Sequence, residues 1–455
     1  MAKLINLSTI GADHIRDETP CQDFGGILER ENCHIFATAD GHGSSSCTRS
    51  DIGSKNAVGC ALACLEEFHS QMEEEGLVEG FLQNPNDASM RIEHLILSII
   101  SYWRIAAEED FQQHPLSESE RNLSQKYLAD YEKGHRIERL YGTTLIAGLL
   151  TDRYLLLLQQ GDGRCVVFDE KGAVSQPIPW DDTCFLNVTT SLCDQDAIER
   201  FRYHLINLED KKIVACFASS DGVEDSFPNL ELMESYFRSQ LLSISEAGFD
   251  EHLEEWSNSL STFSSEGSRD DVTITGFIDV GSIHSLSEKF ERENRIVNLN
   301  AQLLEVHKRL KSMDGMNKYS LLTKRLDEKQ THLESLQSKL LELEEEKESY
   351  TNELQSFLQE IENKLNVNLS NLASYTLPLI SPIKTSVLKA KHVMEDRKEK
   401  LSLEKETLTE QIQILTTDID KLKEEIGIIV DRRVSLESEQ DALRIEIDAL
   451  ISSDC

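Results

Sequence analysis

The sequence predicts an α+β domain followed by a long α-helical region. In the first part of the chain, short β-like runs bounded by Gly or Asp alternate with helical stretches. In the second part, proline is absent between Pro228 and Pro378 and again after Pro382, and leucine recurs at heptad spacing. The composition changes after the segment GFIDVG, so we expect one domain at residues 1–283 and a coiled-coil region at residues 284–455.

The elements of the first domain follow from local patterns of apolar residues. Strands are expected at residues 4–10, 34–39, 144–150, 153–159, 164–168, 213–219 and 272–278. Helices are expected at Ile52–His69, Arg91–Phe111, Glu199–Leu205, Leu230–Leu242 and Phe249–Phe263. Several strands are neighbours or are separated only by short turns. A mixed or antiparallel sheet covered by helices is therefore favoured over a doubly wound sheet.

The helical region carries a strong heptad signal. Leucine or isoleucine stands at every seventh position at Leu401, Leu408, Leu415, Leu422, Ile429, Leu436, Leu443 and Leu450. A similar row includes Leu326, Leu333, Leu340, Leu354 and Ile361. We expect two arms, at about residues 285–366 and 385–452, separated by a break at about residues 367–384.

Two arrangements of these arms remain open. Isoleucine three residues before several of the leucines favours a parallel two-stranded coiled coil between chains, and hence a homodimer. The break, which contains Pro378 and Pro382, suits the tip of an antiparallel hairpin within one chain. Its apolar residues Leu377, Leu379 and Ile380 either form a docking surface for a protein partner or pack locally.

Composition excludes several classes of function. The chain has 455 residues, 82 Asp and Glu against 46 Lys and Arg, and a net charge of −36. Such an acidic surface repels nucleic acid and anionic membranes, so we expect neither as a partner. The N-terminus lacks a secretory signal and no apolar run is long enough to span a membrane, which predicts a cytoplasmic protein. The ten cysteines form no C-x-x-C pair, so we expect reduced thiols.

Familiar nucleophile and nucleotide motifs are also absent from the sequence. There is no C-x5-R loop of thiol-dependent phosphatases, no phosphate-binding loop of the form G-x-x-x-x-G-K-[ST], and no G-x-S-x-G elbow. A hydrolase built on this chain must therefore activate water in another way.

Aspartates occur at the ends of the predicted strands. Asp40, Asp162 and Asp221 follow strand candidates, and each is followed by Gly; Asp270 and Asp271 precede the last strand. One Asp-Gly pair alone usually marks only a turn. Together, at strand ends that meet on one edge, several carboxylates would converge, and their mutual repulsion calls for a cation. Oxygen donors favour Mg²⁺ or Mn²⁺ over Zn²⁺.

A pair of such cations can share a carboxylate and activate water for attack on phosphorus without a protein nucleophile. His42 lies two residues after Asp40, the candidate bridging carboxylate, and could protonate a leaving alkoxide. A lone histidine is more often structural, but this one adjoins the acidic cluster.

Six motifs occur in order: Cys21-Gln22-Asp23, Ala39-Asp40-Gly41-His42-Gly43, Gly142-Thr143-Thr144, Gly161-Asp162-Gly163-Arg164, Ser220-Asp221-Gly222 and Arg269-Asp270-Asp271-Val272. From Leu4 to Asp279 the chain resembles the metal-dependent serine/threonine protein phosphatases of the type 2C family, in a divergent bacterial branch. The resemblance implies a four-layer sandwich of two antiparallel β-sheets flanked by helices. It also implies two Mn²⁺ or Mg²⁺ ions, with a third ion at a weaker site.

The resemblance also assigns roles to residues. Asp40 resembles the carboxylate that bridges both metals, Gly41 the residue that offers its carbonyl, and Asp221 and Asp270 the other direct ligands. Asp23 matches the acidic residue of the first motif, Asp162 the aspartate of the third metal site, and His42 the proposed general acid. Arg16 is the candidate for holding the substrate phosphate, because guanidinium binds two phosphate oxygens. Residues 177–192 are expected to form a flap over the cleft.

Three positions depart from the family pattern. Gln22 replaces a common glutamate, Asp271 a common asparagine, and Gly163 a common serine. The sequence thus predicts a serine/threonine phosphoprotein phosphatase whose coiled coil dimerises it or tethers it to a partner. The alternatives are a signalling scaffold or weakly active pseudophosphatase, which Gln22 would favour, and a hydrolase of small phosphorylated molecules.

Overall fold

The computed structural model describes residues 2–184, 188–315, 318–371 and 380–453. Its chain forms two compact units, Met1–Leu299 and Asn300–Cys455. The division falls inside helix α12 (Ser287–Gly315), a little after the change in composition near residue 284. No helix in the described ranges is long and apolar enough to cross a membrane.

Two antiparallel five-stranded sheets form the centre of the first unit. In spatial order, the first sheet consists of β1 (Ala2–Thr9), β10 (Val272–Asp279), β9 (Ile213–Ser219), β6 (Arg164–Asp169) and β7 (Val174–Ser175). The second consists of β2 (Phe24–Glu29), β3 (Cys33–Ala39), β4 (Leu145–Thr151), β5 (Tyr154–Gln160) and β8 (Arg202–Asn207). The two antiparallel sheets predicted through the resemblance are therefore confirmed.

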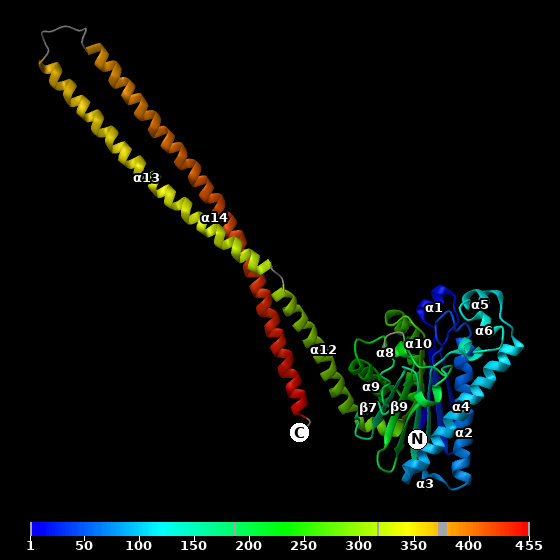
Figure 1. Ribbon diagram of the computed structural model, residues 1–455. Coiled ribbons are helices and arrows are strands. Elements are labelled where there is room, and N and C mark those ends of the chain that lie inside the picture. The colour runs from blue at the N-terminus through cyan, green and yellow to red at the C-terminus, as the bar shows by residue number, and fades with distance from the viewer. Residues whose placement is uncertain (1, 185–187, 316–317, 372–379, 454–455) are drawn as a thin grey trace. The chain divides into compact units, whose positions relative to one another are not determined.

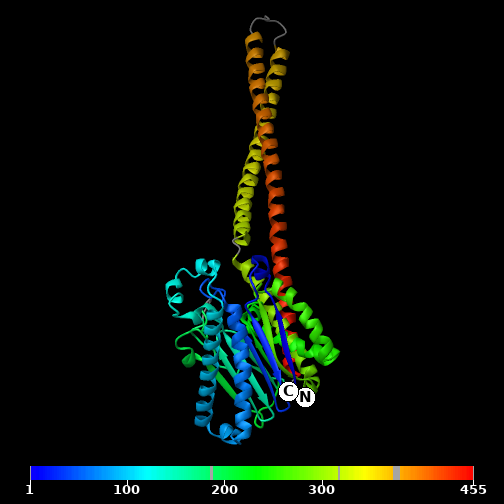
Figure 2. The same ribbon diagram turned by 90° about the vertical axis from the view of Figure 1, so that its right-hand side faces the viewer.

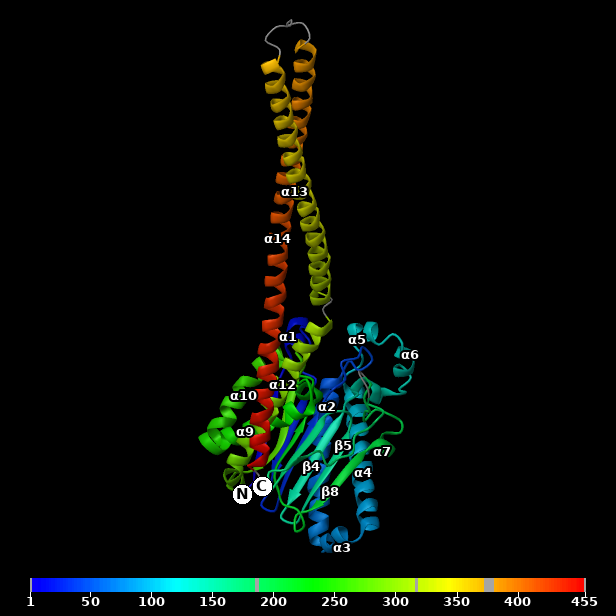
Figure 3. The ribbon, with the colours of Figure 1, turned by 90° about the vertical axis from the view of Figure 1, so that its left-hand side faces the viewer.

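Helices cover both outer faces of this sandwich (Figures 1 and 2). The second sheet packs against α2 (Ser50–Glu74) and α4 (Pro85–Gln113), and the first against α9 (Leu230–Ala247) and α10 (Phe249–Glu266). The shorter helices are α1 (Ala12–Asp17), α3 (Val78–Gln83), α5 (Glu118–Leu123), α6 (Leu128–Tyr131), η1 (Ile137–Tyr141), α7 (Ala197–Arg200), α8 (Asp221–Glu224), α11 (Val280–Ile283) and η2 (His284–Leu286). Figure 3 shows α1, α5 and α6 at one end of the sandwich and α3 at the other.

Three apolar cores separate the four layers. One lies between α2, α4 and the second sheet, one between α9, α10 and the first sheet, and one between the two sheets. Strands β4 and β5 are buried along their whole length because both faces are covered. This explains their continuous apolar sequence, which made them easy to predict. The local sequence favours a helix start at α4. The side chain of Asn84 caps the helix by accepting hydrogen bonds from the amides of Asn86 and Asp87, and Pro85 occupies the first helical position.

Three strands, β2, β7 and β8, were not predicted, and one helix prediction is wrong. A helix was expected at Glu199–Leu205, but α7 ends at Arg200. The chain continues as strand β8, which pairs with β5. The sequence pattern of this segment is compatible with both a helix and a strand. Pairing with the buried strand β5 therefore determines that it forms a strand. Strand β2 was missed because its sequence, FGGILE, contains two glycines, which are depleted in strands.

The nine cysteines in the described ranges are free thiols.

In the second unit, the long helices α13 (Lys318–Asn371) and α14 (Ile380–Ser452) pack antiparallel along each other, as all three ribbon views show. Ion pairs between them fix the direction: Glu344 pairs with Lys405, and Lys329 pairs with Asp418. The heptad row of α14 is buried or half-buried from Leu401 to Leu450. The repeat therefore packs within the chain in this structure.

The predicted break at residues 367–384 lies partly outside the described residues, which omit 372–379. Helix α13 continues to Asn371 and α14 starts at Ile380, while Leu377, Pro378 and Leu379 lie outside the described residues. The side chains of Ile361, Ile380 and Pro382 are not described either. Where one arm was expected at residues 285–366, the structure has two helices, α12 and α13.

Candidate functional site

The predicted aspartates gather at one edge of the sandwich because of the strand directions. Asp40 directly follows β3, and Asp162 follows β5 after one glycine; these strands run the same way, since each pairs antiparallel with β4. In the other sheet, Asp221 lies just after β9 and Asp270 just before β10, which is antiparallel to β9. Asp23 precedes β2. Both sheets thus bring carboxylates to the same edge.

A cavity of about 790 Å³ opens at this edge. Its wall includes Asp40, Gly41, His42, Asp162, Asp221 and Asp270, together with Asp225, Asp271 and Asp194. The segment expected as a flap contributes Val188, Thr189 and Ser191, while its residues 185–187 lie outside the described ranges. The cavity therefore brings together six of the predicted site residues, and seven of its 21 lining residues are aspartates.

Asp23 lies at this edge, buried, with an exposed fraction of 6%. Its Oδ2 atom has no hydrogen-bond partner among the described residues. Burial raises the pKa of this carboxyl group well above its usual value; a hydrogen bond from Ser220 acts against this shift, and the charge of Asp271 adds to it. A buried carboxylate oxygen without a partner is costly, so this position suits a bound cation or its water.

The carboxyl groups of Asp40 and Asp221 lie close enough to shift the pKa of each other. Burial raises the pKa of Asp40 well above its usual value, and the charges of Asp221 and Asp23 raise it further. Burial also raises the pKa of Asp221 to about 7, with contributions from Asp162 and Asp270. Two carboxyl groups this close hold a proton when no cation is present. The same arrangement would release that proton when a divalent cation binds.

The backbone around Asp40 is fixed by hydrogen bonds. Its carbonyl accepts from the Thr144 amide at 2.8 Å and from the Thr143 hydroxyl at 2.8 Å, and its amide donates to the Thr144 hydroxyl at 3.0 Å. The next residue must be glycine, because a Cβ on Gly41 would lie 2.6 Å from the carbonyl oxygen of Ser50. Thr143 and Thr144 of the G-T-T motif thus position the Asp40 carboxylate by fixing the backbone of Asp40.

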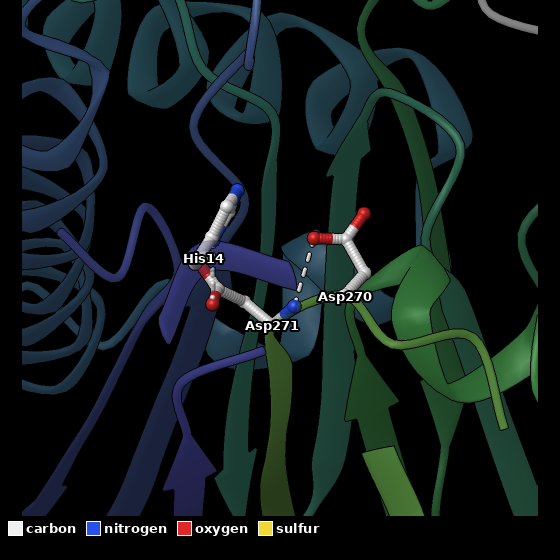
Figure 4. Close-up of side chains that lie close together, drawn as sticks. All are labelled: His14, Asp270 and Asp271. Carbon is white, nitrogen blue, oxygen red and sulfur yellow. Dashed lines mark hydrogen bonds and ion pairs between the residues drawn. The ribbon is translucent and has the colours of Figure 1, made fainter. Parts of the chain in front are cut away.

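Asp270 and Asp271 are neighbours with different surroundings (Figure 4). Asp270 is exposed in the cavity wall, whereas Asp271 is buried and accepts hydrogen bonds from the backbone amides of Gly11 and Gln22, each at 2.6 Å. Asp271 therefore ties the start of the chain to β10.

His14 joins this pair and was not predicted. Its Nδ1 atom lies 2.8 Å from Oδ1 of Asp271. His14, Asp270 and Asp271 each offer one ligand atom, and these atoms lie within 4.8 Å of one another. His14 belongs to α1, and no motif or spacing in the sequence distinguishes it from a surface histidine.

His42 is half-buried in the cavity wall, and its amide donates to the Gly142 carbonyl at 3.0 Å. Burial lowers the pKa of the imidazole, although the charges of Asp162 and Asp194 act in the opposite direction. A Cβ on Gly142 would lie 2.8 Å from Cδ2 of His42, so this glycine leaves room for the ring.

Arg16 is not brought to the cavity. It lies on α1, where its side chain donates to Asp17 at 2.8 Å and to Asp13 at 2.9 Å, and it is 59% exposed. The hydrogen bond that Arg16 donates to Asp17 is the main reason why the pKa of Arg16 is raised. The cavity wall instead contains Arg139, from η1, which sequence reasoning did not single out. No motif surrounds Arg139, so only the fold reveals it.

The sandwich, with its carboxylate-lined edge, places this chain in the class of metal-dependent protein phosphatases, and comparison with protein families supports this. The model of the family described as protein phosphatase 2C matches residues 10–257. The chain belongs to the protein phosphatase 2C family, as its motifs predicted. Among curated proteins, no match was found.

Solved structures with a similar fold include several phosphatases. The serine/threonine phosphatase Stp1 from Staphylococcus aureus is 16% identical, with 61% of this chain and 95% of that chain covered and a TM-score of 0.36. The catalytic domain of the serine/threonine phosphatase PstP, in complex with two manganese ions, is 15% identical, with 61% and 97% covered and a TM-score of 0.36. RsbX in complex with magnesium is 14% identical, with 61% and 94% covered and a TM-score of 0.31.

Proposed function

We propose that this protein hydrolyses phosphoserine and phosphothreonine in protein substrates, at the carboxylate-lined cavity, with two bound Mn²⁺ or Mg²⁺ ions. The observation that carries the proposal is the convergence of Asp23, Asp40 and Asp221, whose carboxyl groups have raised pKa values. Like charges that are buried together cost stability unless a cation neutralises them. Membership of a metal-dependent phosphatase family supports the same assignment.

The residues fit a hard divalent cation. Asp40 would bridge two ions, Asp221 and Asp270 would bind directly, and Gly41 would offer its carbonyl oxygen. Asp23, with its unpartnered Oδ2, would bind from the buried side, directly or through water. Asp162 would serve a third ion. Carboxylate and carbonyl oxygens are the donors that Mg²⁺ and Mn²⁺ prefer. When bound, the ions supply a nucleophilic water and neutralise charge on the phosphoryl group.

His42 completes the chemistry of the chain. After the bond between phosphorus and the side-chain oxygen breaks, the serine or threonine alkoxide needs a proton. His42 lies in the same cavity wall, two residues after Asp40, and is proposed to donate that proton. The lowered pKa of its imidazole makes it a ready proton donor once it is protonated, because a weaker base releases its proton more easily.

The helical unit is proposed to tether the phosphatase to a protein partner. The antiparallel pairing of α13 and α14 uses the heptad rows within the chain, which favours a partner-binding role over a parallel homodimer. Light scattering on the full chain tests the arrangement: the mass of one chain supports the intrachain hairpin, and twice that mass supports dimerisation.

The proposed activity is tested by hydrolysis of a phosphothreonine peptide. Wild type should turn over the peptide with Mn²⁺, and a chelator or Asp221→Asn should abolish turnover. The matched control is Asp152→Asn, because Asp152 lies in the turn between β4 and β5, at the end of β5 opposite Asp162. This control should keep wild-type turnover. Circular dichroism verifies that each variant is folded.

The outcome also separates the two alternative functions. A folded, Mn²⁺-loaded wild type that does not act on phosphopeptides or small phosphate esters would support the signalling scaffold. Gln22 is the feature that favours this alternative, since a neutral amide lines the cavity where the family often has a carboxylate. Efficient turnover of small phosphorylated metabolites with poor turnover of phosphopeptides would instead support a small-molecule phosphatase.

A further inference from the structure

The cavity wall carries many acidic side chains and, among the described residues, one side chain of lysine or arginine, that of Arg139. A phosphate monoester carries a charge of about −1.5 to −2 near neutral pH, so carboxylates repel it. Bound cations offset part of this repulsion. A guanidinium adds two parallel N–H donors that match two phosphate oxygens. Arg139 is therefore well suited to hold the phosphoryl group.

The backbone that carries Arg139 is fixed at the catalytic edge. Helix η1 ends at Tyr141, and the carbonyl of Gly142 accepts a hydrogen bond from the His42 amide at 3.0 Å. The buried guanidinium of Arg49 donates to the Tyr141 hydroxyl at 2.9 Å, which holds the other side of this segment. Arg139 thus projects from a short helix that hydrogen bonds keep beside the proposed general acid.

The side chain of Arg139 lies over the ring of Tyr127, and no carboxylate of the described residues pairs with it. Its Cζ atom lies 4.5 Å from the centre of the Tyr127 ring, and Tyr127 also lines the cavity. No carboxylate of the described residues lies within ion-pair distance of Arg139, whereas Arg16 pairs with Asp13 and Asp17. A guanidinium over an aromatic ring is held by a cation–π contact and keeps N–H donors that can bind an anion.

We propose that Arg139 forms the phosphate-binding subsite of this cavity and takes two oxygens of the substrate phosphoryl group. The subsite would accept phosphate monoesters and inorganic phosphate, the reaction product. This inference rests on the proposed phosphatase function and assigns to η1 the role that the sequence predicted for Arg16. Tyr127 is then a positioning residue, because it acts on substrate only through the guanidinium.

Two measurements on the Mn²⁺-loaded full chain test the proposal. Steady-state hydrolysis of a phosphothreonine peptide gives KM and kcat, and calorimetric titration with inorganic phosphate gives a Kd without any turnover. Arg139→Ala should raise KM and the Kd for phosphate by about tenfold to a hundredfold, with a smaller change in kcat, because it removes a charge-assisted contact made in the bound ground state. Arg139→Lys keeps the charge but loses the fork, so it should recover part of the loss.

A matched control is available three residues away. Arg136 is exposed and has a φ of 57°, a left-handed conformation that glycine adopts without strain. Arg136→Gly removes one arginine from the same segment and should leave KM and the phosphate Kd at wild-type values. Arg16→Ala is the competing variant. If Arg16→Ala raises both constants and Arg139→Ala does not, the subsite belongs to α1 and the proposal is overturned.

The other outcomes are equally decisive. Equal phosphate binding by wild type and folded Arg139→Ala overturns the proposal. A raised KM for the peptide with an unchanged Kd for phosphate also overturns it, since Arg139 would then contact the peptide rather than its phosphate. Phosphate binding that depends on Arg139 in a protein without turnover would retain the subsite and overturn the proposed function instead.

Discussion

The carboxylate-lined cavity of the sandwich and the paired helices α13 and α14 are both rich in acidic side chains, but they hold them in different environments. At the cavity, the carboxyl groups of Asp40 and Asp221 lie close to each other, and Asp23 is buried at the same edge; the pKa of each is raised. In the helical pair, Glu344 and Glu346 are well exposed and pair with cations of the facing helix. Acidic residues thus cost stability in the first region and little in the second.

This difference indicates which acidic residues serve function. Buried carboxylates without cationic partners destabilise a fold, and they are typical of sites where a bound ligand compensates for their burial. Exposed and paired carboxylates on a helix keep a long helical pair soluble and in register. The four predictions below change one environment at a time.

The largest effect is expected from neutralising the bridging carboxylate. Asp40→Asn should lower turnover of a phosphothreonine peptide by at least about a thousandfold, equal to about 4 kcal/mol of transition-state stabilisation. The rise in Tm that Mn²⁺ gives to the wild type should also be lost, because that rise reflects binding to the folded state. Asp420→Asn, an exposed aspartate on α14, is the reference and should change neither quantity. Wild-type turnover by Asp40→Asn would remove this residue from the metal site.

The stability of the metal-free sandwich should fall as pH rises. The pKa of Asp221 in the folded protein is about 7, above the value of about 4 for an unfolded chain. Between these two values the folded state holds more protons than the unfolded state, so raising the pH favours unfolding. One such group lowers the free energy of unfolding by up to about 1.4 kcal/mol per pH unit, or about 2 kcal/mol between pH 5 and 7.

Urea unfolding followed by tryptophan fluorescence measures this for the first unit alone, because its three tryptophans are Trp103, Trp180 and Trp256. Asp221→Asn should flatten the pH dependence, and Mn²⁺ should restore stability at pH 7. A metal-free protein that becomes more stable from pH 5 to 7 would contradict the raised pKa.

How far the sequence predicts each region depends on whether the signal is local. Strands β4, β5 and β9 could be predicted because burial on both faces leaves continuous apolar runs, and Asp40 and Asp221 could be predicted because they end such runs. Strand β8 could not, since pairing with β5 rather than its own pattern makes it a strand. Arg139 and His14 reach the cavity from helices that carry no motif.

The helical region shows the same limit. The heptad rows predict which side chains are buried, and Leu401 is buried while Leu403 is exposed. The repeat itself does not determine whether its partner is a second chain or another part of the same chain, because both arrangements bury the same positions. Contacts between residues far apart in sequence, such as Glu346 with Arg397, decide that question in the structure.

A smaller effect is expected from the buried row of α14. Leu401 is fully buried and Leu403, two residues later, is 64% exposed. Leu401→Ala should destabilise the helical pair by about 2 kcal/mol, because it leaves a cavity in a packed interface. Leu403→Ala is the matched control and should cost less than about 0.5 kcal/mol. Urea unfolding followed at 222 nm measures both, and neither variant should alter peptide turnover. Equal costs for the two variants would show that this row is not packed in solution.

The smallest effect is expected from the ion pair between Lys405 and Glu344, whose Nζ and Oε1 atoms lie 2.6 Å apart on the surface of the helical pair. Surface pairs of this kind contribute about 0.2–1 kcal/mol and weaken with salt. Lys405→Glu and Glu344→Lys should each destabilise the pair slightly, and the double variant should recover most of the loss at low ionic strength. Because the two residues face each other only when α13 and α14 run antiparallel, recovery in the double variant supports this register. Independent, additive losses would mean that the two side chains do not meet.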